Sequence, residues 1–251
     1  MQVFERVADW RATRRTLAGT LGFVPTMGAL HAGHLSLIER SLAENDATLV
    51  SIFVNPTQFE SPDDLATYPD RTAQDRALLA ARAVPYLWMP SRDEMYADDY
   101  HYRVSESDYS RLLCGAHRHG HFDGVLTVVM KLLNVAQADR AYFGEKDYQQ
   151  LQLVTGMVDA FFVPTRIVPC PTVREDDGLA LSSRNFKLAP ADRARAAAFP
   201  RALTTSPTAA DARAALEAQG FGVDYVEDRD GRRFGAVRLG AVRLIDNVRL
   251  P

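Results

Sequence analysis

The sequence is short of several features that mark whole classes of protein. The 29 Lys and Arg residues nearly balance the 32 Asp and Glu residues, for a formal net charge of −3. Nucleic-acid-binding proteins usually carry a basic excess on one face, and this balance argues against such a partner. The longest apolar runs, such as Thr48–Val54, are far shorter than the roughly 20 residues of a membrane-spanning helix. We therefore expect neither a nucleic acid nor a membrane as a partner.

A signal peptide and a cysteine framework are also lacking. Charged residues interrupt residues 1–15, whereas a signal peptide needs a continuous apolar segment, so the cytoplasm is the expected location. The two cysteines, Cys114 and Cys170, lack C-x-x-C spacing; one disulfide is possible on paper, but a reducing compartment favours free thiols. Lysine is scarce as well, with Lys131, Lys146 and Lys187 against many arginines. Either codon bias or a site that needs a compact ammonium group explains that scarcity.

The 251 residues are 47% hydrophobic and 24% charged, as in an ordinary globular protein. Apolar runs alternate with segments of helical spacing, which is typical of a parallel α/β sheet. The predicted strands are Gly22–Pro25, Thr48–Val54, Tyr86–Met89, Arg140–Phe143 and Arg166–Val173. The predicted helices are Leu35–Glu44, Ala73–Arg82, Val125–Ala136 and Tyr148–Phe161, and residues 1–19 fit a helix or a strand followed by a helix.

The composition changes after about residue 177. Two Ala- and Arg-rich helices are predicted at Ala189–Ala198 and Ala209–Gln219, with a loop or hinge at Leu203–Thr208. Strand-like runs follow at Val223–Glu227, Gly235–Leu239 and Ala241–Ile245. We therefore expect a Rossmann-like parallel-sheet domain over residues 1–176 and a smaller α+β domain over residues 177–251.

The segment from Phe23 to His34 is the first that indicates chemistry. A predicted strand ends in a turn with two glycines, and a helix is expected to begin at about His34. A helix N-terminus offers free N–H groups and a positive dipole end to a phosphate. Two imidazoles there can donate to charge that develops on a phosphate as its leaving group departs. Two loop histidines without function are the plainer alternative.

The string Pro25–His34 resembles the HIGH-type motif of the nucleotidyltransferase superfamily, which includes the class I aminoacyl-tRNA synthetases. More narrowly, it resembles the signature of the pantothenate synthetase (pantoate–β-alanine ligase) family. Four further segments resemble that family in the same order, namely Ser51–Phe59, Gly120–Val125, Phe143–Gln150 and Asp177–Asn185, and the resemblance resumes at Arg243–Asn247. Members usually run longer, so the C-terminal unit is expected to be shortened.

The resemblance implies an AMP-forming ligase that condenses (R)-pantoate with β-alanine to pantothenate, on the route to coenzyme A. ATP and pantoate would give an enzyme-bound pantoyl adenylate and pyrophosphate, and β-alanine would then release AMP. ATP is a substrate, Mg²⁺ is expected to arrive with it, and a homodimer is the family's usual assembly.

The resemblance also assigns residues, position by position. The implied catalytic residues are His31, His34, Lys146 and Arg184. The implied ATP-binding residues are Met27, Gly28, Ala29, Leu30, His31, Ala32, Gly33, His34, Arg118, Gly144, Glu145, Lys146, Asp147, Val173, Leu181, Ser182, Ser183 and Arg184. The implied substrate-binding residues are Asn55, Gln58 and Gln150, and Tyr68 matches a tyrosine of the family. No resident metal is implied.

These assignments make physical sense. Asn55 and Gln58 follow a buried strand, at the end where open α/β sheets bind ligands. Lys146 supplies a mobile charge for phosphate oxygens, Asp147 can accept from a ribose hydroxyl, and hydroxyls beside Arg184 can clamp a triphosphate.

Plainer interpretations stay open for each segment. Asn55-Pro56 can be an Asx turn, residues 145–147 an exposed helix start, and residues 181–184 a polar loop. His117, His119 and His121, with Cys114 nearby, have the spacing of a metal site, although only Arg118, Gly120 and His121 match family positions. Two other functions remain possible, an adenylate-forming transferase with another acid or amine and a nucleotide-binding regulator without turnover.

Overall fold

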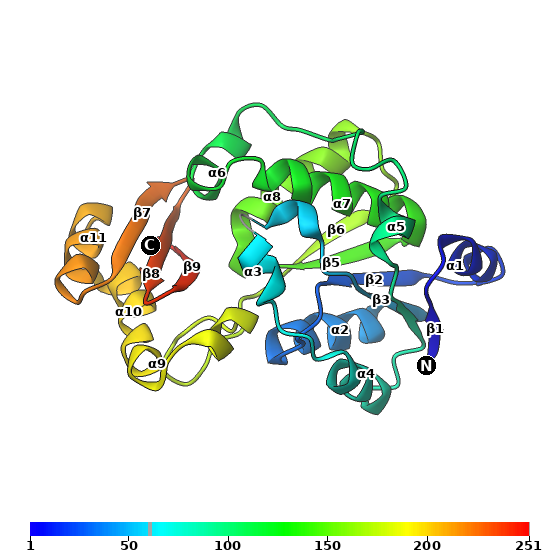
Figure 1. Ribbon diagram of the computed structural model, residues 1–251, viewed down its shortest axis with the longest axis horizontal. Helices are drawn as coiled ribbons and strands as arrows, with labels where there is room; N and C mark the ends of the chain where they lie inside the picture. The colour runs from blue at the N-terminus through cyan, green and yellow to red at the C-terminus, as the bar shows by residue number, and fades with distance from the viewer. Residues whose placement is uncertain (60–61, 251) are drawn as a thin grey trace.

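The computed structural model describes residues 1–59 and 62–250, and its larger part is a six-stranded parallel sheet (Figure 1). The strand order is β1-β4-β3-β2-β5-β6. The strands are β1 (Gln2–Phe4), β2 (Leu21–Thr26), β3 (Ala47–Ile52), β4 (Tyr86–Trp88), β5 (Arg140–Gly144) and β6 (Arg166–Cys170). All five predicted strands of this region are present, and β1 with α1 (Val7–Arg14) resolves residues 1–19 as a strand followed by a helix.

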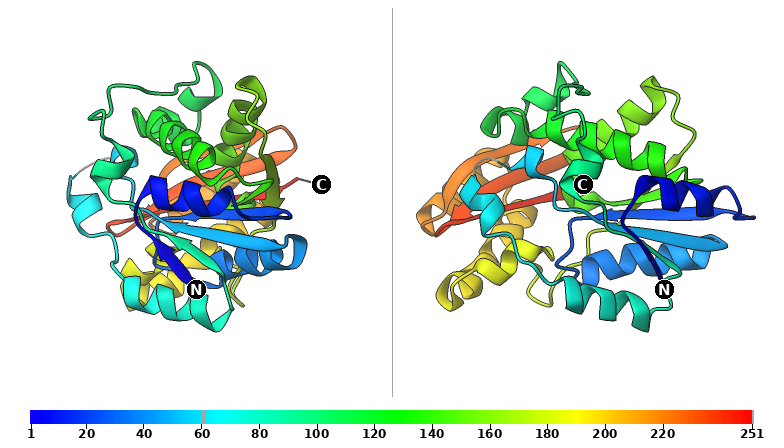
Figure 2. Two further views of the ribbon diagram at one scale, coloured as in Figure 1. Left: turned by 90° about the vertical axis from the view of Figure 1, so that its right-hand side faces the viewer. Right: turned by 45° about the vertical axis from the view of Figure 1, so that its right-hand side comes forward.

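Helices cover both faces of this sheet, because the strands are apolar on both sides. One core joins the sheet to α1, α7 (His121–Ala136) and α8 (Tyr148–Ala160), and a second joins its other face to α2 (Ala32–Glu44) and α4 (Thr72–Ala81) (Figure 2). Short helices lie in the connections, namely α3 (Pro62–Ala66), α5 (Arg92–Met95) and α6 (Cys114–His117). The predicted Rossmann-like α/β class is confirmed.

The C-terminal region forms a second, antiparallel sheet with the order β7-β8-β9. Its strands are β7 (Gly222–Arg229), β8 (Arg232–Leu239) and β9 (Val242–Arg249). Helices α9 (Pro190–Ala196), α10 (Ala198–Thr205) and α11 (Ala209–Ala218) accompany this sheet and share a separate apolar core with it. The predicted α+β unit is confirmed, whereas the boundary at residue 176 stays a prediction.

Several boundary predictions were wrong: β6 ends at Cys170 rather than Val173, and the bounds of three helices also differ. Helix α10 extends to Thr205, so only residues 206–208 of the expected loop connect helices, because Phe199, Ala202 and Leu203 give α10 a buried face. Helix α7 begins four residues before Val125, at His121. Helix α2 begins at Ala32 rather than His34, because His31 takes the N-cap position and its ring Nδ1 accepts from the Gly33 N–H at 3.2 Å.

The order of the strands in the parallel sheet indicates the edge at which a ligand would bind. The chain runs from β2 to β3 and β4 on one side and then returns to add β5 and β6 on the other side of β2. Ligands of open α/β sheets bind beyond the carboxyl ends of the strands at this kind of reversal, here between β2 and β5.

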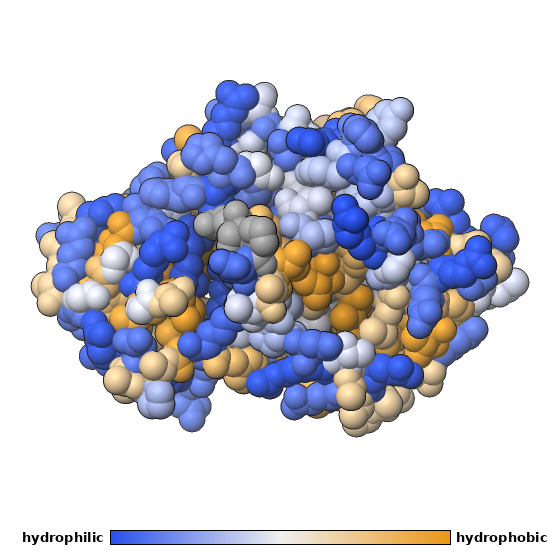
Figure 3. All heavy atoms as spheres, in the orientation of Figure 1, coloured by the Kyte–Doolittle hydropathy of each residue, from blue (hydrophilic) through white to orange (hydrophobic). Residues whose placement is uncertain are grey.

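Both cysteines, Cys114 and Cys170, are buried and free. Within residues 1–59 and 62–250, every helix is too short or too polar to cross a bilayer. The face in view is mostly hydrophilic, with apolar patches near its middle and toward its left and lower right (Figure 3).

Candidate active site

A cavity of about 290 Å³ lies at the carboxyl ends of β2, β3 and β5 and extends to β9. Each of the five segments of the resemblance contributes to its lining, which includes most of the implied site residues. These residues are Met27, His31, Gly33, His34, Asn55, Gln58, Arg118, Gly144, Lys146, Asp147, Gln150, Val173, Leu181, Ser182, Ser183 and Arg184. Gly28, Ala29, Leu30, Ala32 and Glu145 are outside its lining.

The turn after β2, residues 27–31, is fixed by a buried carboxylate. The Asp75 oxygens accept from the backbone N–H groups of Ala29 and Leu30, both at 2.8 Å. Burial raises the pKa of Asp75, and the two N–H groups oppose that rise. These N–H groups are therefore bonded within the protein, and Ala29 and Leu30 shape the turn instead of facing the cavity.

The rings of the two histidines of this segment lie close together, with a tilt of 35° between their planes. The rings of His31 and His34 are 4.1 Å apart between centroids. Burial lowers the pKa of His31 to about 4 and that of His34 to about 3, and the nearby Lys146 ammonium adds to both shifts. Both rings are therefore neutral at pH 7 and can donate one N–H each. A Cβ on Gly33 would lie 2.9 Å from the His31 ring, so glycine is required for that ring to pack there.

Among the described residues, none bonds the buried Nδ1 of His34. A buried polar atom without a partner is costly, and such atoms concentrate where a ligand completes the bonding. His34 is therefore the strongest indication that this cavity is a binding site.

The turn after β5 carries the second charged group. Residues 145–147 form one 3₁₀ turn, and the Lys146 Nζ lies 3.7 Å from the Asp147 carboxylate. Gly144 has an ordinary φ of −75°, and a Cβ placed on it would meet no protein atom within 4 Å. Glu145 does not line the cavity, and its carboxylate pairs with the Arg232 guanidinium at 3.0 Å. The interpretation of residues 145–147 as an exposed helix start does not hold for Lys146, which lines the cavity.

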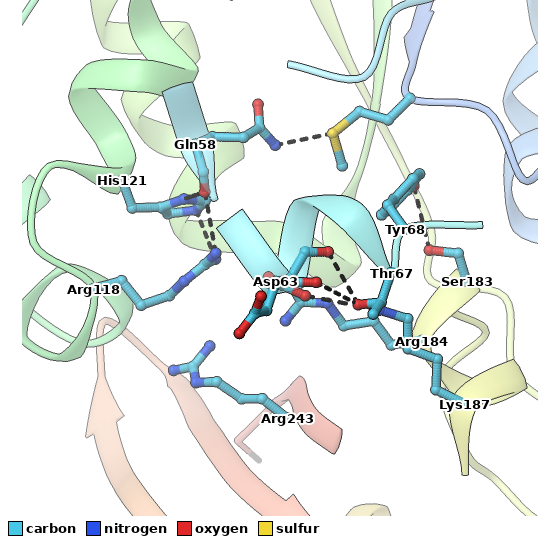
Figure 4. A network of polar contacts seen from close by, with 12 residues as sticks. Gln58, Asp63, Thr67, Tyr68, Arg118, His121, Ser183, Arg184, Lys187 and Arg243 are labelled. Atoms are coloured by element: carbon cyan, nitrogen blue, oxygen red, sulfur yellow. Dashed lines mark hydrogen bonds and ion pairs between the residues drawn. The ribbon is translucent and has the colours of Figure 1, made fainter. Parts of the chain in front are cut away.

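The third loop closes the cavity from the C-terminal side. The Leu181 N–H donates to the Val173 carbonyl, and a 3₁₀ turn over Ser183–Lys187 follows. The Arg184 guanidinium lies 3.4 Å from the Asp64 carboxylate of α3. The Tyr68 and Ser183 hydroxyls are 3.5 Å apart, so the segment after α3 borders this loop (Figure 4).

Asn55 differs from its expected role as a substrate ligand. Its amide donates to the Gln58 side chain and to the Gly124 carbonyl, and its oxygen accepts from Thr57 and Tyr96. All of its bonding capacity is used within the protein, so Asn55 orients Gln58 and forms the Asx-type cap that was the plainer interpretation. The Gln58 amide faces the cavity and lies 3.2 Å from the Met27 sulfur.

Arg118 and His121 hold the other side of Gln58 (Figure 4). His121 Nδ1 lies 2.9 Å from the Gln58 carbonyl and therefore donates, and its Nε2, 3.0 Å from Arg118, accepts. Burial and the Arg118 charge lower the pKa of His121 to about 3, which preserves the neutral ring that this pair needs.

The remaining histidines of this stretch have separate surroundings. The His117 ring packs on Tyr225, and His119 borders a smaller hollow of about 180 Å³. Cys114 accepts from Arg243 and lies 3.1 Å from the Tyr225 hydroxyl. Within residues 1–59 and 62–250 no three His, Cys, Asp or Glu side chains group as metal ligands do.

Sequence reasoning assigned no role to Asp75 or Arg243. Arg243 lines the cavity, and its Nε donates to the Asp224 carboxylate at 2.7 Å. Only the resemblance at residues 243–247 pointed to Arg243, and no local pattern pointed to Asp75, because its partners lie 45 and 46 residues away.

Known proteins resemble this chain over nearly its whole length. The family described as "Pantoate-beta-alanine ligase" matches residues 2–249. A protein of Bdellovibrio bacteriovorus named pantothenate synthetase is 56% identical, and one of Legionella pneumophila with the same name is 49% identical; each match covers at least 98% of both chains. The chain is therefore not shortened relative to these proteins, contrary to the expectation for the C-terminal unit.

Solved structures agree. The pantoate–β-alanine ligase of Francisella tularensis, complexed with β,γ-ATP and β-alanine, has a TM-score of 0.95 at 40% identity and covers 99% of this chain and 97% of its own. The pantothenate synthetase of Thermus thermophilus has a TM-score of 0.93 at 41% identity over both full chains. This chain belongs to the pantoate–β-alanine ligase (pantothenate synthetase) family.

Proposed function

We propose that the protein condenses (R)-pantoate with β-alanine in two steps within this one cavity. In the first step a pantoate carboxylate oxygen attacks the α-phosphorus of ATP, the bond from that phosphorus to the bridging oxygen breaks, and pyrophosphate leaves. In the second step the β-alanine amine attacks the acyl carbon, and AMP leaves with the former carboxylate oxygen. The observation that carries the proposal is His34, a buried ring with an unpartnered Nδ1 in a cavity lined by Lys146 and Arg184.

The first step needs compensation of charge that moves onto pyrophosphate. Neutral imidazoles of His31 and His34 are suited to donate N–H groups to phosphate oxygens as that charge develops. Lys146 supplies a compact positive charge, and Arg184 a planar one that can exchange its Asp64 partner for phosphate. Gly144 leaves the cavity edge open where a side chain would occupy the space of a nucleotide.

The acid and the amine require polar groups at the other end of the cavity. Gln58 offers an amide held by Asn55, and Gln150 borders the cavity from α8. Met27, Val125 and Val129 give this end an apolar wall that suits the branched carbon skeleton of pantoate. These contacts would hold the acyl adenylate while the amine approaches.

The nucleotide substrate is proposed to be Mg·ATP. Mg²⁺ prefers oxygen ligands and commonly arrives on the phosphates of a nucleotide. We also propose a homodimer, which light scattering on the purified chain tests directly.

Pantoate-dependent release of pyrophosphate from ATP, measured before β-alanine is added, tests the proposal. We expect release of about one equivalent per chain and then turnover on addition of β-alanine. Release with other hydroxy acids but not with pantoate would instead favour a different adenylate-forming enzyme. No release with any acid, despite ATP binding, would favour a nucleotide-binding regulator.

A further inference from the structure

Two adjacent residues near the end of β9 contact the two loops that carry Lys146 and Arg184. Asn247 reaches the turn after β5, and Asp246 reaches the segment that leads to residues 181–184. Both side chains are buried. One strand of the C-terminal sheet therefore touches both charged loops of the cavity.

Asn247 holds the main chain on both sides of the Lys146 Cα. Its amide nitrogen donates to the Glu145 carbonyl at 2.9 Å and to the Lys146 carbonyl at 3.0 Å. Its oxygen accepts from Arg232 at 2.5 Å, and Arg232 also pairs with Glu145 and lies 3.8 Å over the Tyr148 ring. Every polar atom of the Asn247 side chain is bonded.

The 3₁₀ turn at residues 145–147 depends on the contacts from Asn247 because it is too short to be stable alone. A single 3₁₀ turn makes few internal bonds of poorer geometry than an α-helix. The position of the Lys146 ammonium therefore follows the position of β9.

Asp246 holds the other loop through Arg174. The carboxylate forms two bonds to that guanidinium, at 2.6 and 2.9 Å. Arg174 forms a β-bridge with Ala180 and donates to the Gly178 carbonyl, so it fixes the turn that precedes Leu181. A bidentate pair of this kind fixes orientation as well as distance.

We propose that Asn247 and Asp246 are positioning residues that set Lys146 and Arg184 relative to each other; this rests on the proposed function. Asn247 lies outside the cavity lining and does not need to touch substrate, whereas Asp246 borders the cavity. Lys146 acts on phosphate charge that is gone once pyrophosphate has left, so loss of the Asn247 contacts should slow the first step far more than the second.

The test uses Asn247→Asp, which keeps an acceptor for Arg232 but presents no donor to the two carbonyls. We expect the single-turnover rate of pyrophosphate release to fall about 10- to 100-fold, the usual effect of a misplaced reacting group. Transfer of β-alanine from preformed acyl adenylate should change by less than about threefold. In a Lys146→Ala background the same substitution should add little, because both changes remove one interaction.

The matched control is Asp228→Asn, which breaks the ion pair with buried Arg233 in the same sheet but contacts neither loop. Both half-reactions should keep their wild-type rates in this variant. Asn247→Ser, which adds no charge, replaces Asn247→Asp if that variant does not fold. Asp246→Asn should likewise slow pyrophosphate release and add little to Arg184→Ala.

A second readout does not depend on activity. Lys131, Lys146 and Lys187 are the only lysines, so labelling with an amine-reactive reagent and mass spectrometry reports each one. We expect Asn247→Asp to change the labelling rate of Lys146 alone. An unchanged Lys146 rate, equal slowing of both half-reactions, or full additivity with Lys146→Ala would overturn the inference. Failure of the wild type to release pyrophosphate would instead count against the proposed function.

Discussion

Two turns at the same sheet edge are held in opposite ways. The turn after β2 is fixed from within the parallel-sheet unit, by Asp75 of α4 and by the N-cap ring of His31. The turn after β5 is fixed from the other sheet, by Asn247 and Arg232. The histidines can therefore take their positions as soon as the parallel sheet forms, whereas Lys146 takes its position only when the antiparallel sheet packs against it.

The largest expected effect is at a reacting group in the helix start that follows the first turn. Replacing His34 with Ala removes one N–H donor to the transferring phosphate, which typically costs about 3–4 kcal/mol, or roughly 10²–10³ in rate. Single-turnover pyrophosphate release measures the loss, and circular dichroism checks that the fold remains. Activity within about threefold of wild type in a folded variant would remove His34 from the mechanism.

The anchor of the first turn should matter for stability as well as rate. Asp75→Ala leaves two buried N–H groups without an acceptor, and we expect the free energy of unfolding to fall by about 2–4 kcal/mol. Urea denaturation measures this. Gln74→Ala, an exposed neighbour on α4, is the control and should have almost no effect. A decrease in the free energy of unfolding no larger than that of Gln74→Ala would show that the turn is stable without the Asp75 carboxylate.

Acid should weaken the protein through three buried histidines, of which His31 ends the first turn and His34 lies in the helix start after it. His31, His34 and His121 have folded-state pKa values of about 4, 3 and 3, against 6.5 in the unfolded chain. Their contribution to stability is therefore fully present above pH 6.5 and is lost as the pH falls toward about 4 for His31 and about 3 for the other two, because over this range only the unfolded chain binds the protons. Each adds a slope of up to about 1.4 kcal/mol per pH unit.

Urea denaturation at pH 7, 6 and 5 measures that slope. His34→Gln should reduce it. Equal slopes in wild type and His34→Gln would contradict the low pKa of His34.

The smallest effect is expected at a residue that serves neither turn. His119 is exposed and borders only the smaller hollow, so His119→Ala should leave turnover with Mg·ATP within about twofold of wild type. Steady-state kinetics and elemental analysis for zinc check this together. One bound zinc per chain, lost with activity in the variant, would revive a metal site at His117, His119 and His121.

Local patterns in the sequence predicted the strands and turns, but they did not reveal hydrogen bonds between residues far apart in the chain. Short apolar runs predicted every strand of both sheets except the short β1, because each of these strands buries apolar side chains. The two-glycine segment and residues 144–147 predicted two turns at one sheet edge, and the structure brings both to one cavity.

The anchors of those turns had no such signal. Asp75 bonds to residues 45 and 46 positions earlier, and Asn247 to residues 101 and 102 positions earlier. An Asp in a helix and an Asn in a strand look ordinary until the tertiary structure supplies their partners. For the same reason Asn55 looked like a ligand, although its partners Gly124 and Tyr96 satisfy it within the fold.

The link between β9 and residues 145–146 also has a consequence for synthesis on the ribosome. Every strand of the parallel sheet precedes Asp246 and Asn247 in the chain, and domains generally fold as their segments emerge. A nascent chain that has made β6 can fold its larger sheet and shape the turn at His31 while Lys146 is still unanchored. Chains interrupted before β9 should therefore accumulate as folded but inactive products, which cellular quality control would have to recognise by something other than an unfolded sheet.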